Sequence, residues 1–259
     1  PFGERGEPMS QLLVSVRSVE EARIAITSGV DILDVKEPSH GALGAATVET
    51  MRAIGQLATE HRPVSVALGE LAEWEFERYR SGDLADVQFA KLGLAHCAKL
   101  VDWPTRWRAA VESLPATVSR VAVAYADQQL AHSPPWQSVI EEAVPLQCDV
   151  LLVDTFDKRR GRLMDWMKIP DLEQIVRAAG EARMKCALAG SLTNDDIAWI
   201  RRFINVDVYA VRTAACAGGR NGRVSEAAIR ELQSNLAVTE SSSSRWNDQL
   251  AKSRGANFG

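Results

Sequence analysis

Short apolar runs alternate with amphipathic segments over most of the chain. Eight of these runs have the length and composition of single strands, with charged or small residues at their ends. They cover residues 11–17, 31–36, 63–69, 86–93, 120–127, 149–155, 185–190 and 207–212. The segments between them space their apolar residues as a helix does, which predicts a helix after each strand.

Local signals mark where some of these helices begin. Ser18 is followed three residues later by Glu21, a capping box for a helix that ends near Ser28. Thr193 and Asp196 have the same spacing after the seventh strand. The other predicted helices cover residues 45–58, 72–80, 105–114, 136–143, 171–182 and 225–236.

This alternation predicts the fold. Strands that alternate with helices pair in parallel, and eight such units over roughly 230 residues fit an α/β protein with a single (β/α)8 TIM barrel. The alternative is an open doubly wound sheet, but no G-x-G-x-x-G follows the first strand. We expect the barrel to cover residues 9–237, between an N-terminal extension at 1–8 and a polar tail at 238–259.

Composition and charge exclude several classes of protein. The chain is 46% hydrophobic and 25% charged, as folded proteins are, and its net charge of −4 argues against a nucleic-acid surface. No apolar run approaches the roughly 18 residues of a membrane span. The four cysteines are scattered and the four histidines lack metal-ligand spacing, so we expect a reduced cytoplasmic protein without a metal or a cofactor.

A charged residue lies within the second apolar run. Lys36 ends this run, and Asp34 lies two residues before it, so both side chains face the same side of the strand. An ammonium in such a place is costly unless it is paired or neutral. A lysine and a carboxylate at the end of a buried strand favour imine-forming chemistry, for which the amine must lose its proton.

Other charged residues collect at the carboxyl ends of the predicted strands, where barrel enzymes have their active sites. Lys91 is near the end of the fourth strand, Asp127 ends the fifth, and Asp154 lies at the end of the sixth, with Lys158 shortly beyond it. If Lys91 and Lys158 lie near Lys36, their charges lower its pKa. Asp34 raises that pKa, which casts it as a proton carrier. Ser15 closes the first strand beside these residues.

A second group of residues suggests a phosphate site. Gly190 and Ser191 end the seventh strand, Arg212 ends the eighth, and Gly218 and Gly219 begin a glycine-rich loop. The loops after the seventh and eighth strands are the usual phosphate site of this fold, and free N–H groups at a helix start attract anions. Residues 158–162 carry further positive charge, of which Lys158 is the better candidate to face the site.

Several ordered motifs resemble one enzyme family. They are Asp-Ile-Leu-Asp-Val-Lys-Glu-Pro at 31–38, the glycine-containing segment 41–45, Lys-Leu-Gly at 91–93, Tyr-Ala-Asp at 125–127, Asp154-Thr155 with Lys158, Lys-Cys-Ala-Leu-Ala-Gly-Ser at 185–191, and Val211-Arg212 with segments 214–216 and 218–219. Together they are similar to the (5-formylfuran-3-yl)methyl phosphate synthase family, over about residues 9–236. The arginine-rich stretch after Lys158 and the tail beyond Val238 depart from that pattern.

The resemblance implies a (β/α)8 barrel that condenses two glyceraldehyde 3-phosphate molecules, with loss of phosphate and water, to a phosphorylated furan aldehyde used in methanofuran biosynthesis. By this resemblance Lys36 forms the Schiff base and Lys91 accepts protons, while Asp34, Asp154 and Lys158 match other active-site positions. Two alternatives stay open: an aldolase-like lyase on another sugar phosphate, and a non-catalytic sugar-phosphate-binding barrel. We expect a small triose phosphate substrate, no nucleic-acid or membrane partner, and a homo-oligomer.

Overall fold

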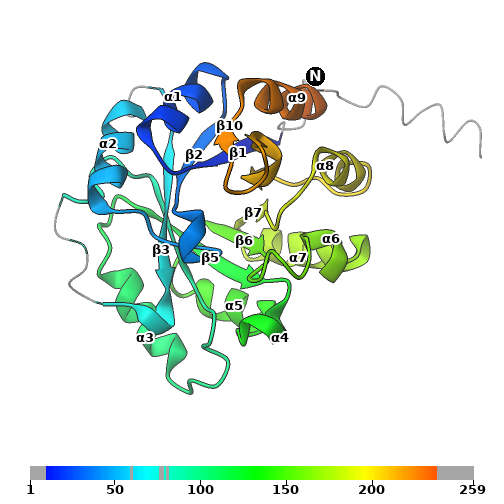
Figure 1. Ribbon diagram of the computed structural model, residues 1–259. Coiled ribbons are helices and arrows are strands. Elements are labelled where there is room, and N and C mark those ends of the chain that lie inside the picture. Colours follow the sequence, from blue (N-terminus) through cyan, green and yellow to red (C-terminus); the bar gives the residue numbers. More distant parts are fainter. Residues whose placement is uncertain (1–9, 59–60, 76–78, 80–81, 238–259) are drawn as a thin grey trace, which may run out of the picture.

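The computed structural model describes residues 10–58, 61–75, 79 and 82–237, and the predicted N-terminal extension and C-terminal tail lie outside this part. Eight parallel strands form a closed barrel in sequence order, with β1 paired to both β2 and β8, which confirms the barrel and excludes an open sheet (Figure 1). The strands are β1 (Gln11–Val16), β2 (Ile32–Val35), β3 (Val64–Glu70), β4 (Phe89–Gly93), β5 (Ser119–Tyr125), β6 (Val150–Asp154), β7 (Lys185–Leu188) and β8 (Val208–Val211).

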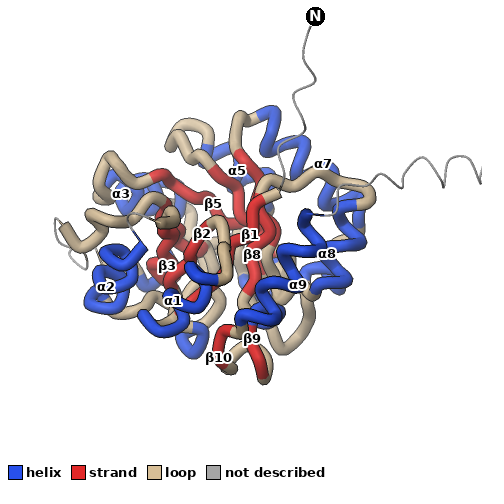
Figure 2. Tube along the Cα trace, turned by 90° about the horizontal axis from the view of Figure 1, so that it is seen from above, coloured by secondary structure: helices blue, strands red, loops and turns tan. Residues whose placement is uncertain are grey.

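Helices surround this barrel. In Figure 2, α1, α2 and α3 flank the strands on one side, and α7, α8 and α9 flank them on the other. The helices are α1 (Val19–Thr27), α2 (Val48–Ala58), α3 (Trp103–Glu112), α4 (Gln128–Ala131), α5 (Trp136–Ala143), α6 (Leu163–Trp166), α7 (Ile169–Glu181), α8 (Asn194–Arg201) and α9 (Glu226–Ala237), with 3-10 turns at η1 (Pro38–His40), η2 (Leu71–Glu73) and η3 (Thr213–Ala215). Ser18 and Thr193 cap α1 and α8 through their side chains, as predicted.

One predicted helix does not form in the described residues. Residues 72–80 have a helical pattern, but this region contains only the 3-10 turn η2, and residues 76–78 and 80 lie outside the described part. Trp74 ends the turn with an extended backbone (φ −70°, ψ 127°). Its ring packs against the core and near Tyr79, so tertiary packing overrides local helix propensity at this point.

Side-chain alternation along the strands separates two packed regions. The outward residues of β1 and β2, such as Leu12 and Leu33, are fully buried beneath the helices. Inward residues form a second cluster inside the barrel. The register places Asp34 of β2 beside Ser15 of β1 and Ser65 of β3 on this inner side. A charged residue therefore lies at the centre of the barrel with hydroxyl groups on both neighbouring strands.

Features at the strand starts are structural. The Asp31 carboxylate accepts a hydrogen bond from the Leu12 N–H at 2.8 Å, and that of Asp207 accepts one from the Cys186 N–H at 2.8 Å. Each contact joins the starts of two neighbouring strands, β1 with β2 and β7 with β8. All four cysteines are buried and unpaired. In the described part of the chain, no helix is long and apolar enough to cross a membrane.

The loop after β8 forms a small hairpin beside the carboxyl ends of the strands. Strands β9 (Cys216–Ala217) and β10 (Arg223–Val224) pair antiparallel, and they lie at one end of the molecule in Figure 2. Gly222 allows this close pairing, because a Cβ atom there would lie 1.8 Å from the Ala217 carbonyl oxygen. The hairpin carries the glycine-rich segment over the candidate site.

Candidate active site

Residues from six strands or their following loops line one small cavity at the carboxyl end of the barrel. The lining includes Ser15, Asp34, Lys36, Lys91, Asp154, Lys158, Gly190, Ser191, Arg212 and Arg220. The structure therefore brings together all five predicted catalytic residues. The cavity has a volume of about 20 Å³, little more than one water molecule needs, so the lysine side chains fill most of it.

The first pair in this cavity is Asp34 with Lys91. The Lys91 ammonium donates hydrogen bonds to the Asp34 carboxylate and, at 3.1 Å, to the Ser65 hydroxyl. The Ser15 hydroxyl donates to the other Asp34 oxygen at 2.9 Å. Burial alone would raise the pKa of Asp34, but the charges of Lys91 and Lys36 and these hydrogen bonds lower it below its usual value. Asp34 is thus an ionised acceptor.

The second pair is Asp154 with Lys158, which is four residues further on. The Lys158 ammonium donates to the Asp154 carboxylate, to the Thr155 carbonyl oxygen at 2.5 Å and to the Thr155 hydroxyl at 3.0 Å. Burial would raise the pKa of Asp154, but the charges of Lys158 and Lys36 lower it. The pKa of Lys158 also falls, because burial outweighs the attraction of Asp154 and Arg220 adds repulsion.

Lys36 differs from the other two lysines. It is 7% exposed, and its ammonium has no hydrogen-bond or ion-pair partner among the described residues. Burial, together with repulsion from Lys158 and Lys91, lowers the pKa of Lys36 to about 8. The charges of Asp34 and Asp154 act in the opposite direction and raise it. The predicted repulsion has the expected direction, but burial is the largest cause. Lys36 is therefore the lysine of this cavity best suited to act as a neutral amine.

The loop after β7 supplies free backbone donors. Gly190 and Ser191 both have positive φ (95° and 54°), and both line the cavity. Within the described residues, the N–H groups of Ser191 and Leu192 have no acceptor. Successive free N–H groups in such a turn are a common anion site. At Gly190 a Cβ atom would lie 3.0 Å from that of Leu163, so the backbone also needs glycine there.

Arg212 lines the cavity, but its guanidinium is engaged by the protein. It donates to both oxygens of Glu21 (2.5 and 3.0 Å) and to the carbonyl oxygens of Ser15 (2.9 Å), Arg220 (3.1 Å) and Gly222 (2.9 Å). These contacts use all five of its N–H groups. Through these contacts Arg212 holds the β9–β10 hairpin against β1 and α1, and its direct contact with phosphate stays a prediction.

The glycine-rich loop contributes a residue that the sequence did not single out. Gly218 and Gly219 have positive φ (81° and 83°) in the hairpin turn and are not in the cavity lining. The next residue, Arg220, does line it and donates to the Gly41 carbonyl oxygen at 2.9 Å. This arginine bridges the loops after β8 and β2. Its position directly after two glycines was the available signal, since those glycines free the backbone to turn inward.

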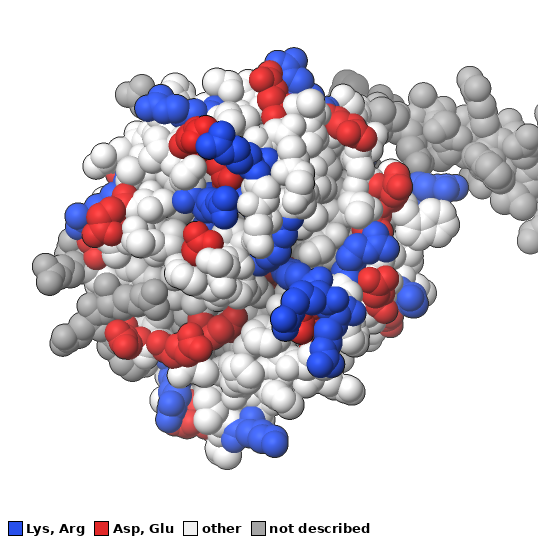
Figure 3. Space-filling model, in the orientation of Figure 1, with Lys and Arg blue, Asp and Glu red and all other residues white. Residues whose placement is uncertain are grey.

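Asp127 has a positioning role that is one step removed from the cavity. Its carboxylate accepts hydrogen bonds from the N–H groups of Phe156 (2.7 Å) and Asp157 (2.9 Å), and its side chain is buried. The loop it holds carries Lys158. In Figure 3, lysine and arginine side chains gather near the middle of this face, beside the region of that loop. The structure therefore supports loop positioning by Asp127 rather than contact with the cavity.

A further, half-buried acid lies at the end of β3 and was not predicted. The Glu70 carboxylate accepts a hydrogen bond from the Tyr125 hydroxyl at 2.6 Å and one from the Ala95 N–H at 2.9 Å. Burial raises the pKa of Glu70 despite these bonds, and burial with the nearby Glu70 charge raises that of Tyr125 well above its usual value. The sequence signal for this acid was a glutamate directly after the third apolar run, at the carboxyl end of a strand.

Among the described residues, no cluster of three or more His, Cys, Asp or Glu side chains could hold a metal.

Solved structures of other barrels resemble this one in fold alone. Phosphoribosyl anthranilate isomerase from Thermotoga maritima matches with a TM-score of 0.60 at 12% identity, covering 88% of this chain and 98% of that one. A 3-hexulose-6-phosphate synthase matches with a TM-score of 0.55 at 17% identity, covering 88% and 100%. At these identities the likeness supports the barrel architecture and carries nothing about the reaction.

Sequence relatives are more specific. (5-Formylfuran-3-yl)methyl phosphate synthase from Methanopyrus kandleri is 34% identical over 241 residues, covering 88% of this chain and 99% of the relative. The enzyme of that name from Methanocaldococcus jannaschii is 31% identical over 236 residues, covering 86% and 97%. The family described as 4-HFC-P synthase matches residues 12–233, nearly the whole barrel. The chain belongs to the 4-HFC-P synthase family.

Proposed function

We propose that this protein is a (5-formylfuran-3-yl)methyl phosphate synthase that condenses two glyceraldehyde 3-phosphate molecules through a Schiff base on Lys36. The family membership supports the product, and the relatives' name is the source of that assignment. The single observation that carries the mechanism is the state of Lys36, a buried amine with a pKa of about 8 and no bonded partner in the described residues. The reaction belongs to methanofuran-type cofactor biosynthesis.

The first steps use the three lysines differently. The neutral Lys36 amine attacks the carbonyl carbon of one triose phosphate, and loss of water gives an iminium. This cation withdraws electrons, so a proton can leave the adjacent carbon. Lys91, which is hydrogen-bonded to Asp34 and Ser65, belongs to a chain of groups that passes this proton onward. Asp34 remains ionised beside the iminium and stabilises its positive charge.

The later steps join the two molecules. The enamine carbon attacks the aldehyde carbon of the second triose phosphate, which forms the new carbon–carbon bond. Ring closure, loss of one phosphate and of two water molecules in total, and hydrolysis from Lys36 give the furan aldehyde. Lys158 with Asp154 supplies acid and base for these eliminations.

The two phosphate groups need cationic or N–H donors. One is placed at the free N–H groups of Ser191 and Leu192 in the loop after β7, a usual phosphate position in this fold. The other is placed near Lys158 and Arg220, whose repulsion lowers the pKa of Lys158. An anion between these two cations removes that repulsion. Because the cavity is nearly filled by side chains, we expect Arg220 to move away from Gly41 when substrate enters.

Borohydride trapping tests the mechanism. The purified protein is incubated with glyceraldehyde 3-phosphate, reduced, digested and analysed by mass spectrometry, and the peptide containing Lys36 should carry the added mass. Lys36→Met should abolish the label, whereas Lys99→Met, at an exposed lysine, should retain it. A label that persists in Lys36→Met would overturn the assignment of the Schiff-base lysine.

Product analysis tests the reaction separately. A furan aldehyde absorbs in the near ultraviolet, whereas an aldol product does not. Glyceraldehyde 3-phosphate alone should therefore give a new absorbance together with one free phosphate per furan. Trapping at Lys36 with only a simple aldol product would instead identify a class I aldolase-like lyase on this site.

A further inference from the structure

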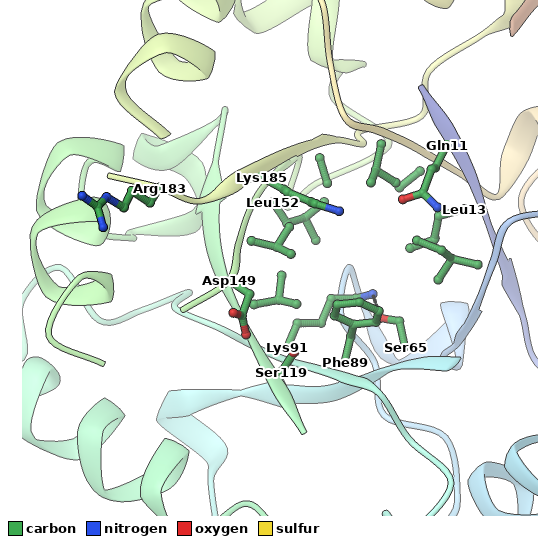
Figure 4. A pocket seen from close by; sticks show the side chains of 16 residues that line it. Gln11, Leu13, Ser65, Phe89, Lys91, Ser119, Asp149, Leu152, Arg183 and Lys185 are labelled. Carbon is green, nitrogen blue, oxygen red and sulfur yellow. Dashed lines mark hydrogen bonds between the residues drawn. The ribbon is translucent and has the colours of Figure 1, made fainter. Parts of the chain in front are cut away.

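A second, larger cavity opens at the opposite end of the barrel. It has a volume of about 360 Å³ and is lined by the first inward residues of the strands, among them Gln11, Leu13, Phe89, Val121 and Lys185 (Figure 4). Pockets of this size hold small organic ligands. The proposed reaction takes place at the other end of the strands and makes no use of this cavity.

Small inward side chains explain why this space exists. Barrel interiors of this fold are usually filled by layers of bulky branched residues. Here Ser65, Ala187 and Ala210 take inward positions in the cavity lining. Ala187 of β7 lies between Leu152 of β6 and Val208 of β8, and all three line the cavity. A methyl group at this central position leaves the space that a leucine side chain would fill.

The cavity is open to solvent. The inward residues Leu13 and Val121 are each 8% exposed, although they lie in the middle of buried strands. Their outward neighbours Leu12 and Ala122 are 0% exposed beneath the helices. Inward residues can be exposed only if solvent enters the barrel, so a ligand of small cross-section has an entrance.

The charges at the entrance are asymmetric. Figure 4 shows the Lys185 side chain reaching from β7 into the space, whereas Arg183 points away from it. Asp149 lies at the side of the entrance. The walls are mostly apolar, with Leu13, Val121 and Leu152 among them. One inward ammonium above apolar walls complements a molecule with one negative group and an apolar body.

The inner end of the cavity touches the active site. Lys91 lines both this cavity and the small one, and its ammonium is bonded to Asp34 and to Ser65. Ser65 also lines the large cavity. A molecule in the larger cavity would therefore contact the aliphatic part of Lys91 and the Ser65 hydroxyl that positions its ammonium. It would not enter the region around Lys36, which lines only the small cavity.

We propose that the larger cavity is a binding site for a small amphiphilic monocarboxylate, with its carboxylate at Lys185 and its apolar body between β1, β5 and β6. Such a ligand lowers turnover without competing with substrate, because it acts on Lys91 from the opposite end of the barrel. The binding is independent of the proposed function, and only the effect on turnover rests on it.

Direct binding measurements test the site without relying on activity. The probe is 4-phenylbutanoate, and its neutral amide is the control ligand, both measured by isothermal titration calorimetry on the full chain. We expect the carboxylate to bind and Lys185→Gln to weaken it about threefold, as a partly exposed ion pair contributes under about 1 kcal/mol. Arg183→Gln is the matched control at the same entrance, and its affinity should be unchanged.

A filling variant tests the location. Ala187→Leu places three more carbons in the cavity and should weaken binding at least about tenfold, with circular dichroism used to verify the fold. If this variant does not fold, Lys185→Gln still decides the matter, because an exposed lysine is replaced. The proposal is overturned by equal losses in Lys185→Gln and Arg183→Gln, by equal affinity for the amide, by displacement of the probe by glyceraldehyde 3-phosphate, or by no binding at millimolar probe.

Discussion

Replacing Lys36 by methionine should abolish imine formation and at the same time make the fold more stable. Lys36 is buried at 7% exposure, and burial is the largest cause of its lowered pKa. The folded state therefore holds this side chain in an environment that disfavours its charge. Methionine has a similar length without the charge, so the variant removes an energetic cost along with the proposed nucleophile.

The magnitude follows from the pKa of Lys36. The lysine titrates near 10.5 in the unfolded chain and at about 8 in the folded one. At roughly 1.4 kcal/mol for each tenfold change in the protonation equilibrium, burying the charged form costs about 3 kcal/mol. Because the folded pKa is the lower one, the cost is fully present below pH 8 and disappears as the pH rises towards 10.5. Wild-type stability should therefore increase over this window relative to the variant.

Urea unfolding at several pH values measures this difference. At pH 7, Lys36→Met should have the higher free energy of unfolding, by up to about 3 kcal/mol, and the gap should shrink between pH 8 and 10. The exposed Lys99→Met serves as a control and should change stability by less than about 0.5 kcal/mol at each pH. A gap that is absent at pH 7, or that does not depend on pH, would refute the reasoning about burial.

Three further substitutions test the supporting contacts. Glu21→Gln leaves the buried Arg212 without its charged partner, so the free energy of unfolding should fall by about 3 kcal/mol in urea, and a loss under 1 kcal/mol would contradict this. Gly93→Ala places a methyl group 2.1 Å from a Glu70 oxygen, so the melting temperature should fall by an amount corresponding to about 1–3 kcal/mol. Asp127→Ala removes the acceptor of two loop N–H groups, so hydrogen exchange in residues 155–158 should accelerate; unchanged exchange would exclude the positioning role.

The barrel could be predicted because its signal is repeated along the chain. Each strand has a short apolar run and most are followed by a helical pattern, so an error in one element leaves the count of units intact. The region after β3 shows this: a helix was predicted over 72–80, whereas Trp74 is extended and packs on the core. Whether an aromatic residue extends a helix or turns into the core depends on distant neighbours, which local periodicity does not contain.

The clustering of the candidate catalytic residues could be predicted for a different reason. A barrel brings the carboxyl ends of all its strands together, so a charged residue at a strand end is near the others whatever its position in the chain. The same rule does not tell which hydrogen-bond donors at the strand ends remain free to bind a substrate. Arg212 has the expected position, but Glu21 in α1 and three carbonyl oxygens use its guanidinium. Those partners come from loops and a helix whose approach is fixed only by the folded backbone.

Strand geometry also explains why, of the three lysines that line the small cavity, Lys36 lacks a bonded carboxylate. Asp34 and Lys36 share one face because they are two residues apart, but the same spacing separates them by roughly 6.6 Å along the strand. Asp34 instead bonds Lys91, which reaches it from β4, and Asp154 bonds Lys158 from the loop after its own strand. With both aspartates already bonded, Lys36 is buried beside two other lysines, and these conditions favour its neutral form. The proposed nucleophile is therefore the cavity lysine that neither carboxylate has bound.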